Sequence, residues 1–302
     1  MAEYRRVLVI LNPVSGRKSG GSHTESIREG LGEVQFEIRE WQGGDGPAEW
    51  TASAADEGFD LIIAAGGDGT ACAVADGLAR VGSHVPMAIY PVGSMNFLAG
   101  ELGYPDDTEE IIPWILRQDV VDCDIGYLEE CDRFFLISVS GGLHADIVED
   151  TPRQSKRYLG WLAYAYHSIP ILFYGKWYRL WVRIDGKSYS WKSNAMIILN
   201  MASSLPGTES LPGRVCSNDG KLDLLVNRKG SFFDLVKLYI GKLLKRKFPL
   251  HRLAWDQGRE MTIDSKPPMQ LQMDGESIGK TPVTIKILPG AVKMVAVSLG
   301  SA

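Results

Sequence analysis

A carboxylate stands inside a cluster of glycines in the first third of the chain. Residues 61–70 read LIIAAGGDGT, so a continuous apolar run ends in glycines that surround Asp68. Glycines at the end of a strand let the backbone close around phosphate groups, and the helix that follows favours anions. A bare carboxylate at that point would repel a phosphate. Asp68 must therefore have a role that removes this conflict.

Three roles are compatible with Asp68. A Mg²⁺ ion held by its carboxylate would bridge to phosphate and turn the repulsion into attraction. The carboxylate could instead help to deprotonate an attacking hydroxyl, or it could cap the helix expected over residues 70–81, because Asp is a favoured N-cap. We prefer the magnesium role, since it explains why an acid and a phosphate-binding turn occur together.

Two more turns follow apolar runs in the same third of the chain. NPVSGRKSGG follows the run at 6–11, and VGSMNFLAGELG follows the run at 85–91. In a parallel sheet all three turns would lie at the carboxyl edge, where ligands bind in such folds. The first turn lacks the Lys of GxxxxGK[ST], and Cys72 replaces the last Gly of GxGxxG after the second. The motifs therefore indicate neither a Walker-type ATPase nor a standard dinucleotide-binding protein.

Two Asp-Gly turns occur later in the chain. MDGES contains Asp274 and Glu276, and NDGKLD contains Asp219. Without further context, Asp274-Gly275 is typical of a hairpin turn. Carboxylates in such turns can also accept protons or bind metal ions.

The elements that must position these residues change in character along the chain. The first third alternates apolar strands with helices, which predicts a parallel sheet covered by helices. After about residue 122, strand-like segments separated by Gly-containing turns predict a second, β-rich domain, with a hairpin at IDGKS. The fold class is therefore α/β plus β. The expected strands are 6–11, 34–40, 61–65, 85–91, 134–142, 177–202, 221–226 and 269–287, and the expected helices are 22–32, 47–58, 70–81, 155–174 and 231–247.

Composition excludes several classes of protein. The chain has 302 residues and a net charge of −5, which argues against broad nucleic-acid binding. No segment approaches the roughly 18 to 20 apolar residues of a membrane span, and the apolar run near the amino terminus is too short for a signal peptide. The four cysteines are scattered without a CxxC pair. We expect a cytosolic protein without a disulfide framework or a zinc site.

Taken together, the motifs resemble the diacylglycerol kinase catalytic-domain family, which includes bacterial lipid kinases and eukaryotic sphingosine and ceramide kinases. The resemblance lies in NPVSG, GGDGTACAVADGL and PVGSMNFLA, in this order, and continues through VDCDIG, NDGKLDLLV and MDGES. It implies a nucleotide-binding α/β domain over 1–125, to which residues 290–302 return, and a β-sandwich acceptor domain over 126–289. It also implies an ATP-dependent lipid kinase that uses Mg²⁺.

The resemblance implies roles for individual residues. The proton-accepting carboxylate lies in the Asp274-Gly275-Glu276 turn, with no decision between Asp274 and Glu276, and Asp68 acts in catalysis and in metal binding. Asp219 is the second expected metal ligand, although Asn218 stands where the family has an acid, and a simple turn is the alternative. We expect Asp68→Ala and Asp274→Ala to abolish transfer without disturbing the fold. The residues that match the family's ATP-binding turns are Asn12, Ser15, Gly16, Gly66, Gly67, Asp68, Gly69, Thr70, Ser94 and Asn96.

The acceptor is less defined than the chemistry. Many bacterial diacylglycerol kinases have an acid where this chain has Phe97, and the sequence of this turn is more similar to that of sphingosine kinases. A sphingoid or ceramide lipid is therefore the alternative acceptor to diacylglycerol.

Two later segments suggest peripheral contact with a membrane: the aromatic segment 158–181 and the basic amphipathic segment 231–247. A structural role is the alternative for both segments, and it is the expected role of His167. A homodimer is compatible with the sequence. The rival functions are an NAD kinase-like nucleotide kinase and a non-catalytic lipid-binding regulator.

Overall fold

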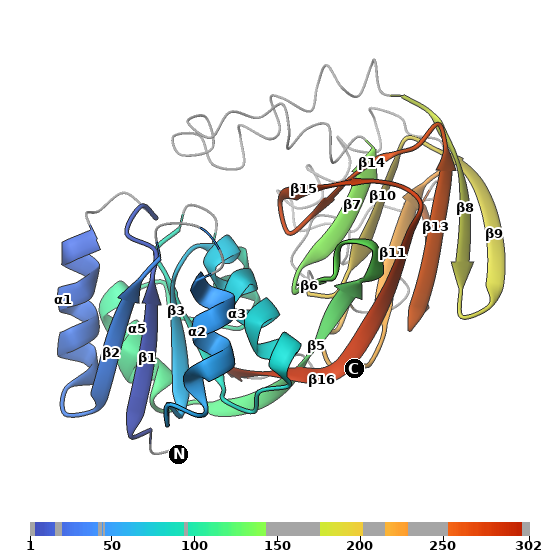
Figure 1. The fold of residues 1–302 in the computed structure, drawn as a ribbon. Coiled ribbons are helices and arrows are strands. Elements are labelled where there is room, and N and C mark those ends of the chain that lie inside the picture. The colour runs from blue at the N-terminus through green and yellow to red at the C-terminus, as the bar shows by residue number, and fades with distance from the viewer. Residues whose placement is uncertain are drawn as a thin grey trace. The chain divides into compact units, whose positions relative to one another are not determined.

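The computed structural model describes residues 4–15, 20–41, 44, 46–93, 96–142, 176–201, 215–228 and 253–297. The chain divides into two compact units, shown in Figure 1. The first unit comprises Met1–Ile125 and Pro289–Ser301, and the second comprises Gly126–Leu288. Strands β5 (Asp119–Leu128) and β16 (Val283–Ala296) contribute residues to both units.

A parallel sheet with helices on both faces forms the first unit, which confirms the predicted α/β architecture. The strand order is β2-β1-β3-β4, and all four strands run in parallel. Every side chain of β3 is buried, because helices cover both faces of the sheet. Helix α1 packs with α5 on one face, and α2 packs with α3 on the other (Figure 1). The bounds are β1 Arg6–Leu11, α1 Gly20–Leu31, β2 Gln35–Glu40, α2 Gly46–Ala54, β3 Leu61–Gly66, α3 Asp68–Val81, β4 Met87–Pro91, α4 Phe97–Glu101 and α5 Thr108–Ile115.

The last strand joins this sheet through a buried tyrosine. Met294 of β16 pairs in parallel with Met87 of β4. The Tyr104 hydroxyl accepts a hydrogen bond from the Ile89 N–H (3.1 Å) and donates one to the Val295 carbonyl (2.9 Å). Burial raises the pKa of Tyr104, so the hydroxyl keeps the proton that it donates. One side chain thus holds two strands that are about 200 residues apart in sequence.

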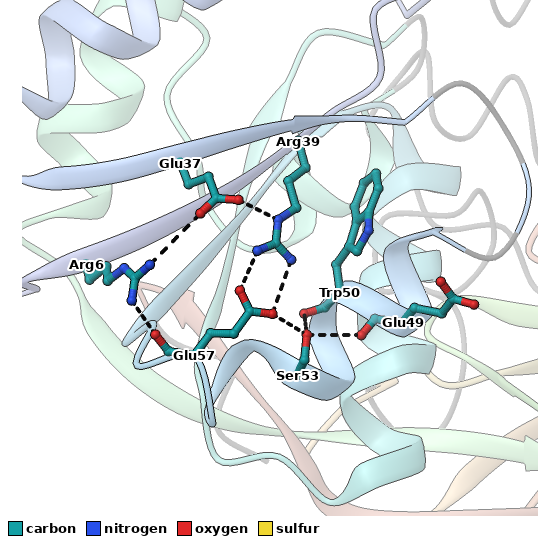
Figure 2. A network of polar contacts seen from close by, with 7 residues as sticks. All are labelled: Arg6, Glu37, Arg39, Glu49, Trp50, Ser53 and Glu57. Carbon is teal, nitrogen blue, oxygen red and sulfur yellow. Dashed lines mark hydrogen bonds and ion pairs between the residues drawn. The ribbon is translucent and has the colours of Figure 1, made fainter.

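A charged network joins the outer strand β2 to the end of α2 (Figure 2). Arg39 pairs with Glu57 and, at 2.8 Å, with Glu37, while Ser53 donates a hydrogen bond to Glu57. Arg6 donates to the Glu57 carbonyl and lies over the Phe59 ring at 4.4 Å from its centroid. The hydrogen bond from Arg39, followed by that from Ser53, lowers the pKa of Glu57. The network fixes the turn between α2 and β3.

Antiparallel sheets form the second unit, which confirms the predicted β-sandwich. One sheet has the order β16-β13-β8-β9, and the other has the order β12-β11-β10-β7-β14-β15. Alternate residues point into a shared core that includes Leu180, Ile198 and Leu271. The bounds are β6 Arg133–Phe135, β7 Ser138–Gly142, β8 Tyr178–Ile184, β9 Lys187–Ser193, β10 Ala195–Leu199, β11 Leu222–Asn227, β12 Leu253–Gly258, β13 Glu260–Lys266, β14 Gln270–Met273 and β15 Glu276–Lys280.

The hairpin predicted at IDGKS joins β8 to β9. Both Asp185 and Gly186 have positive φ, at 46° and 84°, as a type I′ turn requires. Strands β5, β12 and β13 were not predicted, and the half-buried residues of LAWDQG explain why the pattern of β12 is weak. The helices expected at 155–174, with His167, and at 231–247 lie outside the described residues. Among the residues that the structure describes, no helix is long and apolar enough to cross a bilayer.

Candidate functional site

The first predicted turn is tied to the second at the carboxyl ends of β1 and β3. The Asn12 N–H donates to the Ala65 carbonyl (2.9 Å), and Asn12 Nδ2 lies 3.4 Å from Thr70 Oγ1. Asn12 also shapes its own turn, because Oδ1 accepts the Val14 N–H (3.2 Å) and the carbonyl accepts the Ser15 N–H (3.2 Å). Asn12, Ser15 and Thr70 therefore gather at the edge of the sheet where the sequence places them. Gly16 lies outside the described residues.

The second and third turns approach each other so closely that only glycine fits. A Cβ on Gly66 would lie 2.1 Å from Thr70 Oγ1, and a Cβ on Gly93 would lie 2.5 Å from the Gly67 Cα. A Cβ on Gly69, in contrast, would meet no atom within 4 Å. The glycines thus bring two backbones together and leave the start of α3 open. That arrangement suits a phosphate, because the first N–H groups of a helix have no partner within it.

Asp68 links these two turns through its side chain. Helix α3 begins at Asp68 itself, with Gly67 as its N-cap and no capping side chain. Asp68 Oδ1 instead accepts the Leu98 N–H at 2.9 Å, at the start of α4. The idea that Asp68 caps its own helix is therefore wrong, because the carboxylate reaches to the next one. Burial raises the pKa of Asp68, while hydrogen bonds from the Leu98 and Phe97 backbone act in the opposite direction.

Asn96 adds an unsatisfied acceptor to this group. Its backbone has φ of 49°, and its Nδ2 donates to the Pro91 carbonyl at 3.2 Å. Its Oδ1 is buried and has no hydrogen-bond partner among the residues that the structure describes. A buried acceptor without a donor is costly, so a ligand that brings a donor here would be stabilised. Phe97 is half-buried at the start of α4, and Ser94 lies outside the described residues.

These residues fit a nucleotide and a magnesium ion. The open helix start and the unpartnered Asn96 Oδ1 suit a phosphate and a donor group. Mg²⁺ is commonly bound by one or two carboxylates together with phosphate oxygens and water, so the single carboxylate of Asp68 is sufficient. Among the described residues, no three His, Cys, Asp or Glu side chains gather into a ready-made metal site.

The second expected metal ligand lies in a tight turn of the second unit. Asp219 Oδ1 accepts the Lys221 N–H at 3.0 Å, as in an Asx turn. The neighbouring Asp223 is buried, and its Oδ1 accepts hydrogen bonds from Trp255 Nε1 (2.8 Å) and Gln257 Nε2 (3.0 Å). Burial raises the pKa of Asp223. The contacts of Asp219 are those of a residue that shapes a turn, which is the alternative to its role as a metal ligand.

The Asp274 turn is anchored far more firmly than a simple hairpin requires. Asp274 has φ of 49° and follows β14. Its two carboxylate oxygens accept three backbone N–H groups, from Leu136 (2.9 Å), Ile137 (3.0 Å) and Ser138 (2.9 Å). The Asp274 N–H in turn donates to the Ser138 carbonyl at 3.0 Å. The side chain therefore holds the β6–β7 connection against the turn.

Glu276, two residues later, is more exposed than Asp274 and has a different partner. Its side chain is 66% exposed and forms an ion pair of 3.0 Å with Arg133. Arg133 was not identified from the sequence, because 143 residues separate the two and no motif contains it. The turn thus presents one fixed carboxylate and one accessible carboxylate.

Comparison with known proteins places the chain in a family. Residues 6–128 match the diacylglycerol kinase catalytic domain, and residues 137–296 match the YegS C-terminal NAD kinase beta sandwich-like domain. The chain is 27% identical to a diacylglycerol kinase of Bacillus subtilis (strain 168), over 92% of each chain. It is 26% identical to a diacylglycerol kinase of Staphylococcus saprophyticus, over 92% of this chain and 91% of the relative.

Solved structures show the same fold. A crystal structure from Bacillus anthracis str. Sterne has a TM-score of 0.81 at 24% identity, over 98% of this chain and 96% of that one. Another from the same organism, described as a diacylglycerol kinase, has a TM-score of 0.74 at 20% identity, over 98% of both chains. The matches to the two family models, which together span residues 6–296 apart from a short gap, show that the chain belongs to the diacylglycerol kinase catalytic-domain family, with a YegS-type β-sandwich as its second domain.

Proposed function

We propose that the chain transfers the γ-phosphoryl group of ATP to the hydroxyl of a lipid. The observation that carries the proposal is the cluster around Asp68, in which three turns meet at the edge of a parallel sheet beside an open helix start. Family membership identifies this chemistry as that of a lipid kinase. The full length of the match to relatives named diacylglycerol kinase supports an acceptor of that class.

In this proposal the first unit holds the nucleotide. The turns at Asn12, Gly66 to Thr70, and Gly93 to Asn96 bind its phosphates and sugar, and the ten residues matched from the sequence keep that role. Asp68 is oriented by the Leu98 N–H and presents its carboxylate to Mg²⁺, which would neutralise charge that develops on the phosphoryl oxygens. Asp219 is proposed as a ligand of a second, structural ion.

The Asp274-Gly275-Glu276 turn is proposed to accept the proton of the lipid hydroxyl. A proton acceptor has to be fixed relative to the hydroxyl, and the three backbone N–H groups fix Asp274. Glu276 is accessible and is oriented by Arg133. Two variants separate the carboxylates. The acceptor is Asp274 if Asp274→Asn lowers kcat far more than Glu276→Gln, and it is Glu276 if the order is reversed.

The acceptor is proposed to be diacylglycerol, presented at a membrane surface that the protein contacts peripherally. Phe97 carries the competing proposal of a sphingoid or ceramide acceptor, because it lies beside the backbone that holds Asp68. If the Phe97 side chain contacts the acceptor, replacing it with Leu or with an acidic residue would shift the preference between sphingoid or ceramide lipids and diacylglycerol.

The test is transfer of labelled γ-phosphate from Mg·ATP to micellar acceptors. The panel contains diacylglycerol, monoacylglycerol, sphingosine, ceramide and phosphatidylglycerol, with NAD as the non-lipid acceptor. We expect labelled phosphatidic acid from diacylglycerol, and no product from the Asp68→Asn variant. Labelled NADP, or no transfer to any acceptor by correctly folded protein, would contradict the proposal.

A further inference from the structure

The solvent-facing side of β8 alternates tryptophan with arginine. Trp177, which directly precedes β8, and Arg179, Trp181 and Arg183 of β8 occur at every second position, while the residues between them point into the core of the second unit. Trp177 and Trp181 are 42% and 41% exposed. Isolated exposed apolar side chains are common on proteins, but an indole ring on β8 and another on the residue just before it, four positions apart, form a pattern.

The neighbouring strands extend this pattern into a patch, which we call the β8 face. The registers place Arg179 directly between Lys266 of β13 and Lys192 of β9, so three cations form one row across three strands. The next row contains Trp181, and the third contains Arg183. Figure 1 shows the three strands side by side. The β8 face consists of Lys266, Arg179 and Lys192, then Asp264, Trp181 and Ser190, then Thr262, Arg183 and Ser188, together with Trp177.

The charge of this patch is opposite to that of the whole chain. The β8 face carries four cations and one carboxylate, whereas the protein has a net charge of −5. Among the described residues, none of its four cations forms an ion pair, and Asp264 instead accepts the Ser265 N–H at 2.7 Å. The Lys192 ammonium lies over the Trp177 ring at 5.6 Å, which keeps cation and indole together.

Protection of the sheet edge does not explain this arrangement. Lysine on an edge strand discourages aggregation, and β9 is the edge strand that carries Lys192. Arg179 and Lys266 lie on inner strands, where they need no such role. Like charges placed directly opposite in a sheet are unfavourable for folding, so the row weakens the isolated protein and becomes favourable only against negative charge.

We propose that the β8 face docks on the surface of an anionic phospholipid bilayer. Tryptophan is favoured at the boundary between headgroups and acyl chains, and each Lys or Arg close to an anionic leaflet strengthens binding about fivefold. A flat strand face with indoles between cations can place both groups at that boundary at once. The inference rests on the proposed function only in the choice of lipid over nucleic acid, since a lipid kinase must reach a substrate that is held in a membrane.

The test measures cosedimentation of the full chain with phosphatidylcholine vesicles and with vesicles of equal parts phosphatidylglycerol and phosphatidylcholine, without nucleotide. We expect binding only to the anionic vesicles. The variant R179Q/K192Q/K266Q should bind the anionic vesicles about a hundredfold more weakly, because each of the three cations that it removes strengthens binding about fivefold. Trp181→Ser should lower binding severalfold at unchanged charge. The matched control is K187Q/R259Q/K280Q, which removes three exposed cations of the same unit outside the face and should bind like wild type.

The outcomes separate this inference from the proposed function. Transfer to micellar diacylglycerol is measured for each variant, and the β8-face variants should keep it, because micelles without anionic lipid do not require the row. Equal vesicle binding by wild type and the three-glutamine variant would overturn the inference even if the kinase is active. Binding of single-stranded oligonucleotide that is lost in the same variant, without vesicle binding, would also overturn it. Vesicle binding by a protein without kinase activity would uphold the inference and contradict the proposed function.

Discussion

Two Asp-Gly turns of this chain use the same residue pair for different purposes. At Asp68 the carboxylate is largely desolvated and accepts hydrogen bonds from the backbone of Leu98 and Phe97, and among the described residues the Asn96 Oδ1 in the adjoining turn has no donor. At Asp274 the carboxylate accepts three backbone N–H groups of another strand connection. The first arrangement costs stability and is suited to a ligand, while the second contributes stability. A motif therefore shows where a carboxylate is, and its partners show what it does.

The largest expected effect comes from Asp68→Asn. The amide oxygen keeps the bond to Leu98, but the charge that attracts Mg²⁺ is lost, so we expect phosphoryl transfer to fall about a thousandfold or more. The melting temperature should stay equal to that of wild type or rise, because burial disfavours the charge. Near-wild-type turnover would remove Asp68 from the mechanism. A lower melting temperature would show that its role is in the fold.

Asp274→Ala should produce the opposite pattern in stability. Three backbone N–H groups lose their acceptor, which we expect to cost about 2–4 kcal/mol after allowance for partial exposure. The sequence alone predicts an intact fold for this variant, and the hydrogen bonds of Asp274 add the expectation of a measurable loss of stability. Urea unfolding of Asp274→Ala beside Glu276→Gln measures the difference, and the second variant should unfold like wild type. Equal unfolding midpoints for both would mean that Asp274 does not anchor the turn.

A smaller effect is expected where the second and third turns meet. Gly93→Ala places a Cβ 2.5 Å from the Gly67 Cα and 2.8 Å from Asn96 Oδ1, so the turns must move apart. We expect KM for ATP to rise about tenfold or more and stability to fall by about 1–3 kcal/mol. Gly100→Ala is the matched control in α4, where a Cβ would meet no atom within 4 Å. Steady-state kinetics at varied ATP would refute the close approach if the two variants behaved alike.

The smallest effect concerns the ion-pair network. The pKa of Glu57 lies below its ordinary value of 4.5, chiefly because Arg39 donates a hydrogen bond to it. A carboxylate with a lowered pKa in the folded state stabilises the fold above the unfolded pKa, and this stabilisation is lost as pH falls through the folded value. Glu57→Gln should therefore lower stability at pH 7, and the difference should shrink as pH falls below 4.5 and vanish below the folded pKa of Glu57. Glu49→Gln is the control, since only the main chain of Glu49 joins the network (Figure 2).

Local patterns predicted the parts of the molecule that depend on neighbours in sequence. The strands β1, β3 and β4 are continuous apolar runs, and their bounds, like those of the more polar β2, differ from the prediction by at most two residues. The glycine turns were found for the same reason, because each follows directly from its strand. Helix α2 ends at Ala54 rather than at residue 58, since the last residues form a turn before Gly58, whose φ is 82°.

Contacts between distant segments could not be predicted. The N–H groups that hold Asp274 belong to residues 136–138, and nothing in either stretch indicates the other. The link from Asp68 to Leu98 spans 30 residues, and it excludes the helix cap that was one of the three roles considered for Asp68. The cationic row of the β8 face depends on the registers of three strands, of which β13 was not predicted at all.

The most direct measurement is the melting temperature of wild type and of Asp68→Asn, each with and without Mg·ATP. A ligand that binds only the folded state raises the melting temperature. We predict that wild type starts lower and rises when Mg·ATP is added, while Asp68→Asn starts at least as high and rises little. An equal rise in both proteins would contradict the claim that the Asp68 turn gives up stability in order to bind the nucleotide and its metal.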